Sequence, residues 1–160
     1  MNNAALTRYA LTGAFAFATI ALFPSLALAG KCPADKTGIN VRAPDKTPGQ
    51  GVTDKVLAST DLGKEAVKLK NHLFRFRRLV VQPGGVVPWH SHADRPALIY
   101  IESGEIYEYA STCSVPILHK AGDVTAETHI TAHWWKNTGK VPTVILAADI
   151  FPEKGDPHKM

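Results

Sequence analysis

The segment PWHSHADRPALIYIESGEI, residues 88–106, contains two histidines separated by a single residue and followed by a turn and an apolar run. Side chains alternate between the two faces of a β-strand, so His90 and His92 are predicted to project from one face, roughly 6.6 Å apart along the strand. The opposite face is predicted to carry Val87, Trp89 and Ser91. Two imidazoles placed in this way can bind one metal ion, and a third ligand would have to come from elsewhere in the chain.

Short β-like runs separated by turn residues surround this segment. The predicted strands span residues 71–81, 86–92, 97–102, 106–109, 116–119, 123–126, 132–136 and 141–150. Only residues 61–69 have a pattern compatible with a short helix. Many short strands at close spacing favour an antiparallel sandwich or barrel, so the chain is predicted to be all-β.

The N-terminus has the pattern of a secretory signal peptide. Arg8 precedes an apolar run that ends at Pro24, and Ala27-Leu28-Ala29 provides small residues for cleavage after Ala29. The mature protein is then predicted to be periplasmic or secreted, without stable membrane insertion. The uncharged stretch at residues 9–30 is also long enough to span a bilayer, so an uncleaved anchor is the alternative.

The rest of the chain is predicted to form one domain with an arm and a tail. After the signal peptide at residues 1–29, residues 30–51 are rich in Lys, Asp, Pro and Gly and predict an extended N-terminal arm. Residues 52–152 carry the strands, and residues 153–160 form a C-terminal tail. This length is within the usual range for a single domain with its own core.

The chain contains two cysteines, Cys32 in the arm and Cys113 in the predicted barrel. In an oxidising compartment two thiols tend to form a disulfide, so these two are predicted to pair and to tie the arm to the domain. The alternative is two free thiols.

The charge of the chain is mildly positive, with 18 Lys and Arg against 14 Asp and Glu. The basic residues are scattered, and only FRFRR, residues 74–78, concentrates them. Phenylalanine and arginine alternate there as in a half-buried strand, which predicts that Arg75 and Arg77 lie on a solvated face. Nucleic-acid binding is not expected, because it needs a basic face with support from aromatic residues or a motif.

Residues 84–104 resemble the first conserved motif of the cupin superfamily, which reads glycine, five residues, H-x-H, three or four residues, glutamate, six residues, glycine. Gly84 precedes His90 by the expected five residues, and Gly104 closes the motif. The place of the glutamate is taken by Ala97.

Residues 122–137 resemble the second cupin motif, which ends in histidine, three residues, asparagine. Gly122, His133 and Asn137 occupy its expected places. The family's P-x-G before the histidine is replaced by Thr128 and Ile130.

This resemblance implies an antiparallel double-stranded β-helix, the jelly-roll or cupin barrel, with His90, His92 and His133 as metal ligands. Three neutral imidazoles leave a divalent ion its full charge and, in six-coordination, three open positions. The arrangement is similar to that of cupin dioxygenases of the thiol and gentisate types, which use three histidines without the acid. A divalent transition metal is therefore expected, with iron favoured and manganese, zinc, nickel or copper open. The alternative is a barrel without metal.

Other residues near the motifs are candidates for binding a substrate or a fourth metal position. Arg95, in the turn after His92, could hold a carboxylate, or be solvated. Trp135 is expected to share the inward face of His133 and to contact substrate, or only to pack in the core. A fourth ligand could come from Asp94, Glu127 or His129. Tyr100 is expected on the outer face, and the histidines without a partner at ligand spacing are His72, His119 and His158.

Three classes of function fit these features. The first is an exported metalloenzyme, most plausibly an oxygenase acting on a small anionic substrate. The second is a non-catalytic metal-binding or ligand-binding cupin of the cell envelope, and the third is a barrel that has lost its chemistry. Cupin folds serve all three, so the fold does not choose between them. A homodimer is an open possibility, because small cupins often pair through edge strands.

Overall fold

The computed structural model describes residues 30–154, so the predicted signal peptide and residues 155–160 of the predicted tail lie outside the described residues. Its strands are β1 (Gln50–Asp61), β2 (His72–Ser91), β3 (Ala97–Ser103), β4 (Glu105–Ala110), β5 (Ile117–Lys120), β6 (Val124–Glu127), β7 (Ala132–Lys136) and β8 (Thr143–Pro152). One 3-10 turn, Ala34–Lys36, precedes them. Within residues 30–154, no helix is long and apolar enough to cross a membrane.

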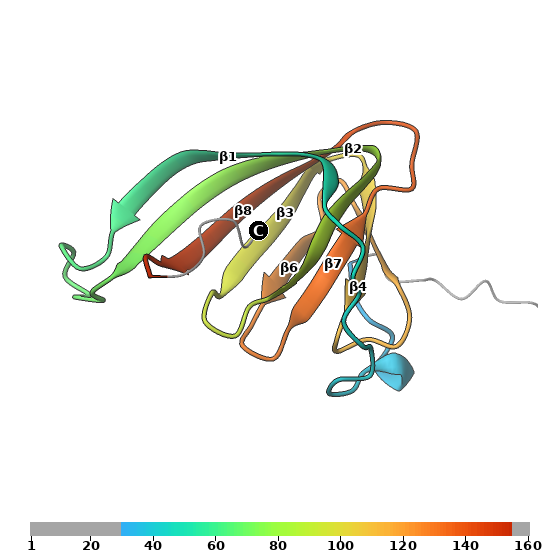
Figure 1. The fold of residues 1–160 in the computed structure, drawn as a ribbon, viewed down its shortest axis with the longest axis horizontal. Coiled ribbons are helices and arrows are strands. Elements are labelled where there is room, and N and C mark those ends of the chain that lie inside the picture. The colour runs from blue at the N-terminus through green and yellow to red at the C-terminus, as the bar shows by residue number, and fades with distance from the viewer. Residues whose placement is uncertain (1–29, 155–160) are drawn as a thin grey trace, which may run out of the picture.

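The strands form one strongly curled antiparallel sheet (Figure 1). Its order is β5-β4-β7-β2-β8-β3-β6, and β1 adds to β2 beside this path. Apart from β4 and β5, neighbours in this order are not consecutive in the chain, as in a jelly roll, in which strands from the two ends of the domain lie side by side. The prediction of an all-β antiparallel jelly-roll barrel is confirmed.

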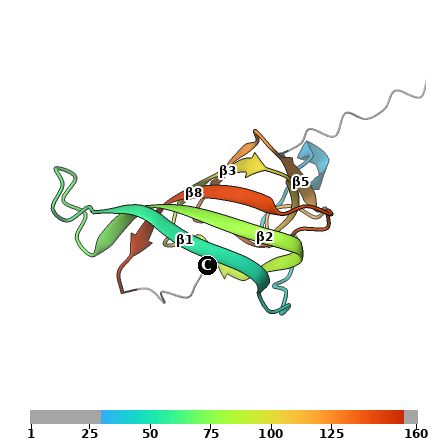
Figure 2. The same ribbon diagram turned by 90° about the horizontal axis from the view of Figure 1, so that it is seen from above.

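The longest strand, β2, joins the two sides of the curl. Two separate strands were predicted here, but they are one strand that continues through Gly84, whose φ of 77° a glycine adopts without strain. Residues 72–81 pair with β8, whereas residues 86–91 pair with β7. Figure 2 shows β1, β2 and β8 running side by side along the first of these halves.

A β-bulge interrupts the second half of β2. Val87 lies opposite Trp135 and His90 lies opposite His133, so the β2 side contains one residue more than the β7 side. Such a bulge reverses the alternation of side chains beyond it. Val87 is therefore buried and lines the same cavity as His90, and its predicted place on the opposite face is wrong.

The first half of β2 faces the other way from the prediction. Arg75 and Arg77 point into the barrel and are 9% and 6% exposed, whereas Phe74 and Phe76 are 49% and 40% exposed on the outside. The prediction of solvated arginines is wrong because Asp149, on the neighbouring strand β8, supplies a buried carboxylate for both guanidinium groups. Alternation defines two faces but does not say which one is inside.

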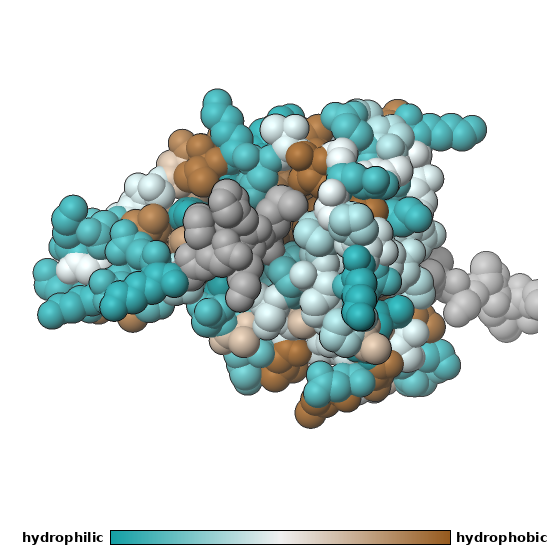
Figure 3. All heavy atoms as spheres, in the orientation of Figure 1, coloured by the Kyte–Doolittle hydropathy of each residue, from teal (hydrophilic) through white to brown (hydrophobic). Residues whose placement is uncertain are grey.

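The predicted helix at residues 61–69 is also absent. These residues form turns in the connection between β1 and β2, and the backbone adopts positive φ at Lys68 (53°) and Asn71 (57°). A left-handed residue ends a helix rather than continuing it. Figure 3 shows mostly hydrophilic side chains over this end of the molecule.

The segment at residues 30–49 packs against the barrel. Cys32 and Cys113 form a disulfide, and Thr37 makes an isolated β-bridge to Cys113. The disulfide closes a loop of 81 residues, which corresponds to about 4 kcal/mol of stabilisation in the chain-entropy picture. The main core lies inside the curl and is built from aliphatic residues of β2, β3, β4 and β8 together with Trp135.

Candidate metal centre

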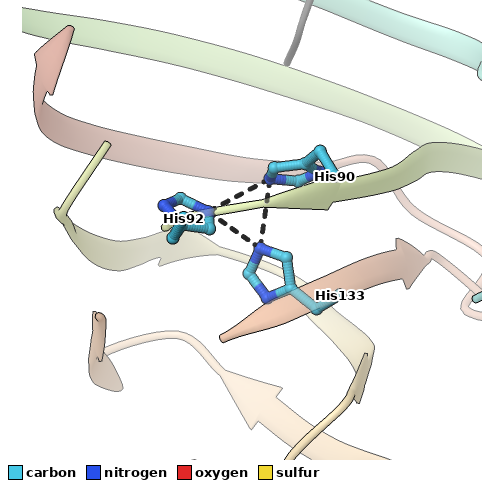
Figure 4. Close-up of side chains that lie close together, drawn as sticks. All are labelled: His90, His92 and His133. Carbon is cyan, nitrogen blue, oxygen red and sulfur yellow. Dashed lines mark hydrogen bonds between the residues drawn. The ribbon is translucent and has the colours of Figure 1, made fainter. Parts of the chain in front are cut away.

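Three histidines, from β2, from the residue that follows its end and from β7, meet inside the barrel (Figure 4). His90 and His133 are directly opposite each other on β2 and β7, and His92 follows two residues after His90 on the same face. The three Nε2 atoms are 3.1–3.2 Å apart. His92 and His133 are buried, and His90 is partly buried. The structure thus brings together the three residues proposed as metal ligands.

The oxygen atom that lies next to Nδ1 of each ring determines which ring nitrogen carries the proton. Nδ1 of His90 lies 2.9 Å from the carbonyl oxygen of Pro88, and Nδ1 of His92 lies 2.7 Å from that of Arg95. Nδ1 of His133 lies 2.7 Å from Oε1 of Glu108. Carbonyl and carboxylate oxygens only accept, so each Nδ1 carries a hydrogen and each neutral ring turns an Nε2 lone pair toward the others.

The ring pKa values follow from burial and from neighbouring charge. Burial, followed by the nearby His133, lowers the pKa of His90 well below its usual value and that of His92 to about 3. Burial also acts to lower the pKa of His133, but Glu127 and Glu108 outweigh it and raise that pKa. His90 and His92 are therefore neutral near pH 7, and their Nε2 lone pairs are directed at the centre of the cluster.

A divalent metal ion fits this position. Imidazole nitrogens bind such ions at about 2.0–2.1 Å, so three ligands of one tetrahedral or octahedral ion lie roughly 2.9–3.4 Å apart. The observed separations of the Nε2 atoms, 3.1–3.2 Å, are within that range. These three residues form one of two potential metal-binding groups among the described residues, and the other consists of Glu108, Glu127 and His133.

Glu108 on β4 is the functional residue that the sequence analysis missed. Its carboxylate bridges two histidines, with Oε1 at 2.7 Å from Nδ1 of His133 and Oε2 at 2.8 Å from Nε2 of His119. Burial favours its neutral form, but the two hydrogen bonds outweigh it and lower its pKa to about 2. A carboxylate behind a metal-binding histidine fixes the ring and raises its basicity.

The sequence of β4 does not by itself show that Glu108 faces inward, because Tyr107 and Tyr109 make the other face apolar as well. Ile106, Glu108 and Ala110 alternate with exposed or half-buried residues on β4, so an acidic residue stands between two apolar residues on the inward face. A carboxylate is rarely buried without a partner. His119, which had no partner at ligand spacing in the sequence, is the second residue of this buried pair.

The three candidates for a fourth ligand are placed differently. Asp94 and His129 are exposed and do not reach the centre. Glu127 is buried, but its Oε2 lies 3.6 Å from Nδ1 of His133, on the side of the ring away from the other two histidines. Burial raises the pKa of Glu127 to about 7. Glu127 is also the strand partner of Ala97, the position where the cupin motif has its glutamate.

A cavity of about 30 Å³ lies beside the histidines. Trp135 lines it and points its indole Nε1 at Nε2 of His133, at 3.3 Å. This places Trp135 on the inward face, as predicted, and its contact with substrate stays a prediction. The other lining residues are Arg77, Leu79, Val87, His90, His92, Ile99, His133, Ile145 and Ala147.

A cluster of buried charges extends along the barrel from this cavity. Arg75 forms a two-pronged ion pair with Asp149, through distances of 2.9 and 2.6 Å. Arg77 contacts Asp54 of β1 at 2.5 Å. Arg95 is 3% exposed and 3.9 Å from Asp149, so it is neither solvated nor among the lining residues of the cavity. Burial, followed by the charge of Arg77, lowers its pKa to about 10.

Comparison with known proteins agrees with this fold and site. The Cupin_2 family model, described as a cupin domain, matches residues 77–149, which include all three histidines. No curated protein sequence matches the chain significantly.

Among solved structures, the Cnp3 cupin domain of Schizosaccharomyces pombe matches with a TM-score of 0.50 at 16% identity, over 63% of this chain and 65% of that one. A predicted oxalate decarboxylase of Thermotoga maritima is 30% identical over 48% of this chain and 65% of its own, with a TM-score of 0.44. KdgF from Halomonas sp. is 18% identical, over 66% and 83% of the two chains, with a TM-score of 0.48. The chain thus spans slightly less than two thirds of the first two structures. Residues 77–149 of the chain thus match the cupin domain family, and the jelly-roll fold agrees with this match.

Proposed function

We propose that this protein is an exported metalloprotein in which His90, His92 and His133 bind a divalent transition metal and a small anionic molecule binds beside it. The observation that carries the proposal is the convergence of three Nε2 lone pairs at 3.1–3.2 Å, with every Nδ1 directed at an acceptor. Lone pairs at this distance repel one another unless a cation lies between them.

The chain's own residues prepare this site for chemistry on a small molecule. Glu108 holds the ring of His133 through its Nδ1–H, and the carbonyl oxygens of Pro88 and Arg95 hold the other two rings. Trp135 presents an N–H donor to the same space, and aliphatic side chains limit water around it. A bound transition metal would supply Lewis acidity and, in the case of iron, redox chemistry with dioxygen. We therefore favour an oxygenase-type enzyme.

A second candidate is a cupin that binds a metal or ligand without catalysis. The small cavity, about 30 Å³, favours it, because little space is available beside the histidines for a substrate. Oxygen consumption by the iron-loaded protein with a panel of small acids and thiols separates the two. Uptake with any of them supports the enzyme, and metal binding without uptake supports the second candidate.

Metal content tests the site itself. His90→Ala, His92→Ala or His133→Ala should each remove most of the bound metal, because two imidazoles hold a divalent ion weakly in water. Asp94→Ala and His129→Ala are matched controls on exposed residues and should leave metal per chain nearly unchanged. Elemental analysis of the exported protein measures both. Loss of metal in Glu127→Gln as large as in His90→Ala would instead show that Glu127 is a ligand.

Export remains a proposal that a mass measurement tests. We expect the mature protein in the periplasm or medium to begin at Gly30, with the Cys32–Cys113 bond formed. Intact mass without reductant measures both features. A membrane-bound chain that retains Met1 would support the uncleaved anchor. The homodimer also stays a prediction, and sedimentation over a range of concentrations would detect it.

A further inference from the structure

The cavity at the metal centre contains a charged residue that neither cupin motif includes. Arg77, on the first half of β2, lines the cavity together with the three histidines and is only 6% exposed. Its Nε is buried and makes no hydrogen bond, because the nearest carboxylate oxygen, on Asp149, is 3.5 Å away. A buried donor of this kind is costly unless a ligand or water satisfies it.

The carboxylates around Arg77 are bound by arginine residues of the same cluster. Both oxygens of Asp149 are already bound by Arg75, at 2.9 and 2.6 Å. Nη1 of Arg77 donates a hydrogen bond to Oδ2 of Asp54. Among the described residues, the buried cluster contains the guanidinium groups of Arg75, Arg77 and Arg95 and the carboxylates of Asp54 and Asp149.

The cavity itself contains no compensating anion. Among the described residues that line it, none is acidic, and Arg77 is the one with a permanent charge. Its other walls are aliphatic, apart from the histidines and Trp135. A guanidinium binds a carboxylate through parallel hydrogen bonds, and the low polarity of these walls strengthens such a pair.

Resting on the proposed function, we propose that Arg77 is the anion-binding residue of this cavity and that its ligand is a small carboxylate, with the carboxylate group at Arg77 and the remainder directed toward the histidines. Arg95, selected from the sequence for this role, lies outside the lining of the cavity. The volume of about 30 Å³ limits the ligand to a molecule close to acetate in size, with a short apolar part against the aliphatic wall.

Calorimetric titration of the exported protein with acetate, and with acetamide as its neutral isostere, tests the assignment. We expect acetate to bind and acetamide to bind at least about tenfold more weakly. Arg77→Gln should weaken acetate binding by about tenfold or more. The matched control is Arg78→Gln, which removes the same charge one residue later on the exposed outer face and should change the affinity by less than about twofold. Equal binding of acetate and acetamide, or an equal loss in both variants, would overturn the assignment.

A second variant gives the opposite change and does not depend on how Arg77→Gln folds. Asp54→Asn removes the carboxylate that competes for Arg77 and should tighten acetate binding by about threefold or more. An unchanged or weaker affinity in Asp54→Asn would count against Arg77.

Titrations before and after removal of metal by a chelator, with zinc content measured on each preparation, separate this inference from the proposed function. Arg77→Gln should retain zinc while losing acetate. A protein that never binds zinc but binds acetate through Arg77 would refute the metal centre and leave the anion site standing.

Discussion

The two halves of β2 bury polar groups in different ways. In the first half, Arg75 and Arg77 are matched by Asp149 and Asp54, so opposite permanent charges meet as soon as the strands pair. In the second half, His90 and His92 meet His133, and three lone pairs point at one another. Folding alone compensates most of the charge in the first half, whereas the second half leaves a group of three histidines that could bind a metal ion.

This difference explains why we assign a structural role to the first half of β2 and a binding role to the second half. A buried ion pair whose partners are hydrogen-bonded, such as that of Arg75 and Asp149, holds the strands in position without a further ligand. A cluster of imidazole rings whose lone pairs converge can be stabilised further by a bound metal ion. Arg77 lies where the two regions meet, since it belongs to the charge cluster and also lines the cavity of the histidines.

The largest effect is expected from Asp149→Asn, which removes the central carboxylate of the first half. Asp149 is fully buried and is the partner of Arg75, so its loss should leave buried guanidinium charge unpaired and lower the free energy of unfolding by about 3–5 kcal/mol. Chemical denaturation of the metal-free protein measures it. Glu102→Gln, which breaks an exposed ion pair with Arg78, is the control and should change stability by less than about 1 kcal/mol. Similar small effects in both variants would remove the distinction between the two regions.

The second largest effect is expected from Glu108, which supports His133 beside the second half of β2. Its protonation at low pH should lower the free energy of unfolding. The pKa of Glu108 is lowered to about 2 in the fold from its usual 4.5, so the ionised form stabilises the folded state. That stabilisation is fully present above about pH 4.5 and is lost as the pH falls to about 2, with a total of about 3 kcal/mol. Unfolding of the metal-free protein at several pH values measures it, and Glu108→Gln should remove this dependence.

Glu127 is the control, because its contribution to stability should change with pH in the opposite direction to that of Glu108. Its pKa is raised to about 7, so its protonated form stabilises the fold below about pH 4.5, and this contribution is lost as the pH rises to about 7. Glu127→Gln should remove the decline between pH 4.5 and 7 and keep the loss at lower pH. If the two variants gave the same pH profile, the two carboxylates would have to act as one group.

The smallest effect is expected on the outer face of the first half. Phe76 is 40% exposed, so Phe76→Thr should cost about 1 kcal/mol or less, since threonine is well accommodated in a strand. Leu79→Ala, at a buried position of the same strand, is the control and should cost about 2–5 kcal/mol. Thermal and chemical unfolding compare the two variants. A loss of several kcal/mol in Phe76→Thr would show that the phenylalanines, not the arginines, lie inside.

Much of the fold and the metal centre could be predicted because the signals are local or have a fixed spacing. Alternation and turn residues placed most strand boundaries within two residues, as at β7 and β3. The two-residue spacing of His90 and His92 gave a common face without knowledge of any partner. His133 came from the second motif, and β7 places it directly opposite His90.

Where prediction failed, a residue far away in the sequence decides the outcome. The inward direction of Arg75 depends on Asp149, 74 residues later, and the role of Glu108 depends on His133, 25 residues later. The bulge that turns Val87 inward depends on pairing with β7. None of these contacts leaves a pattern within a single strand.

The sequence by itself determined the all-β class, the strands from β3 to β8 and the three histidines, because alternation, turn residues and motif spacing are properties of neighbours along the chain. It did not predict β1, and it divided β2 into two strands. Only the tertiary structure decided which face of β2 is inside, which carboxylate supports His133, and that Arg77 rather than Arg95 lines the cavity. The physical reason is that burying a charge is favourable only when a partner compensates it, and in a sheet of this topology the partners come from distant strands.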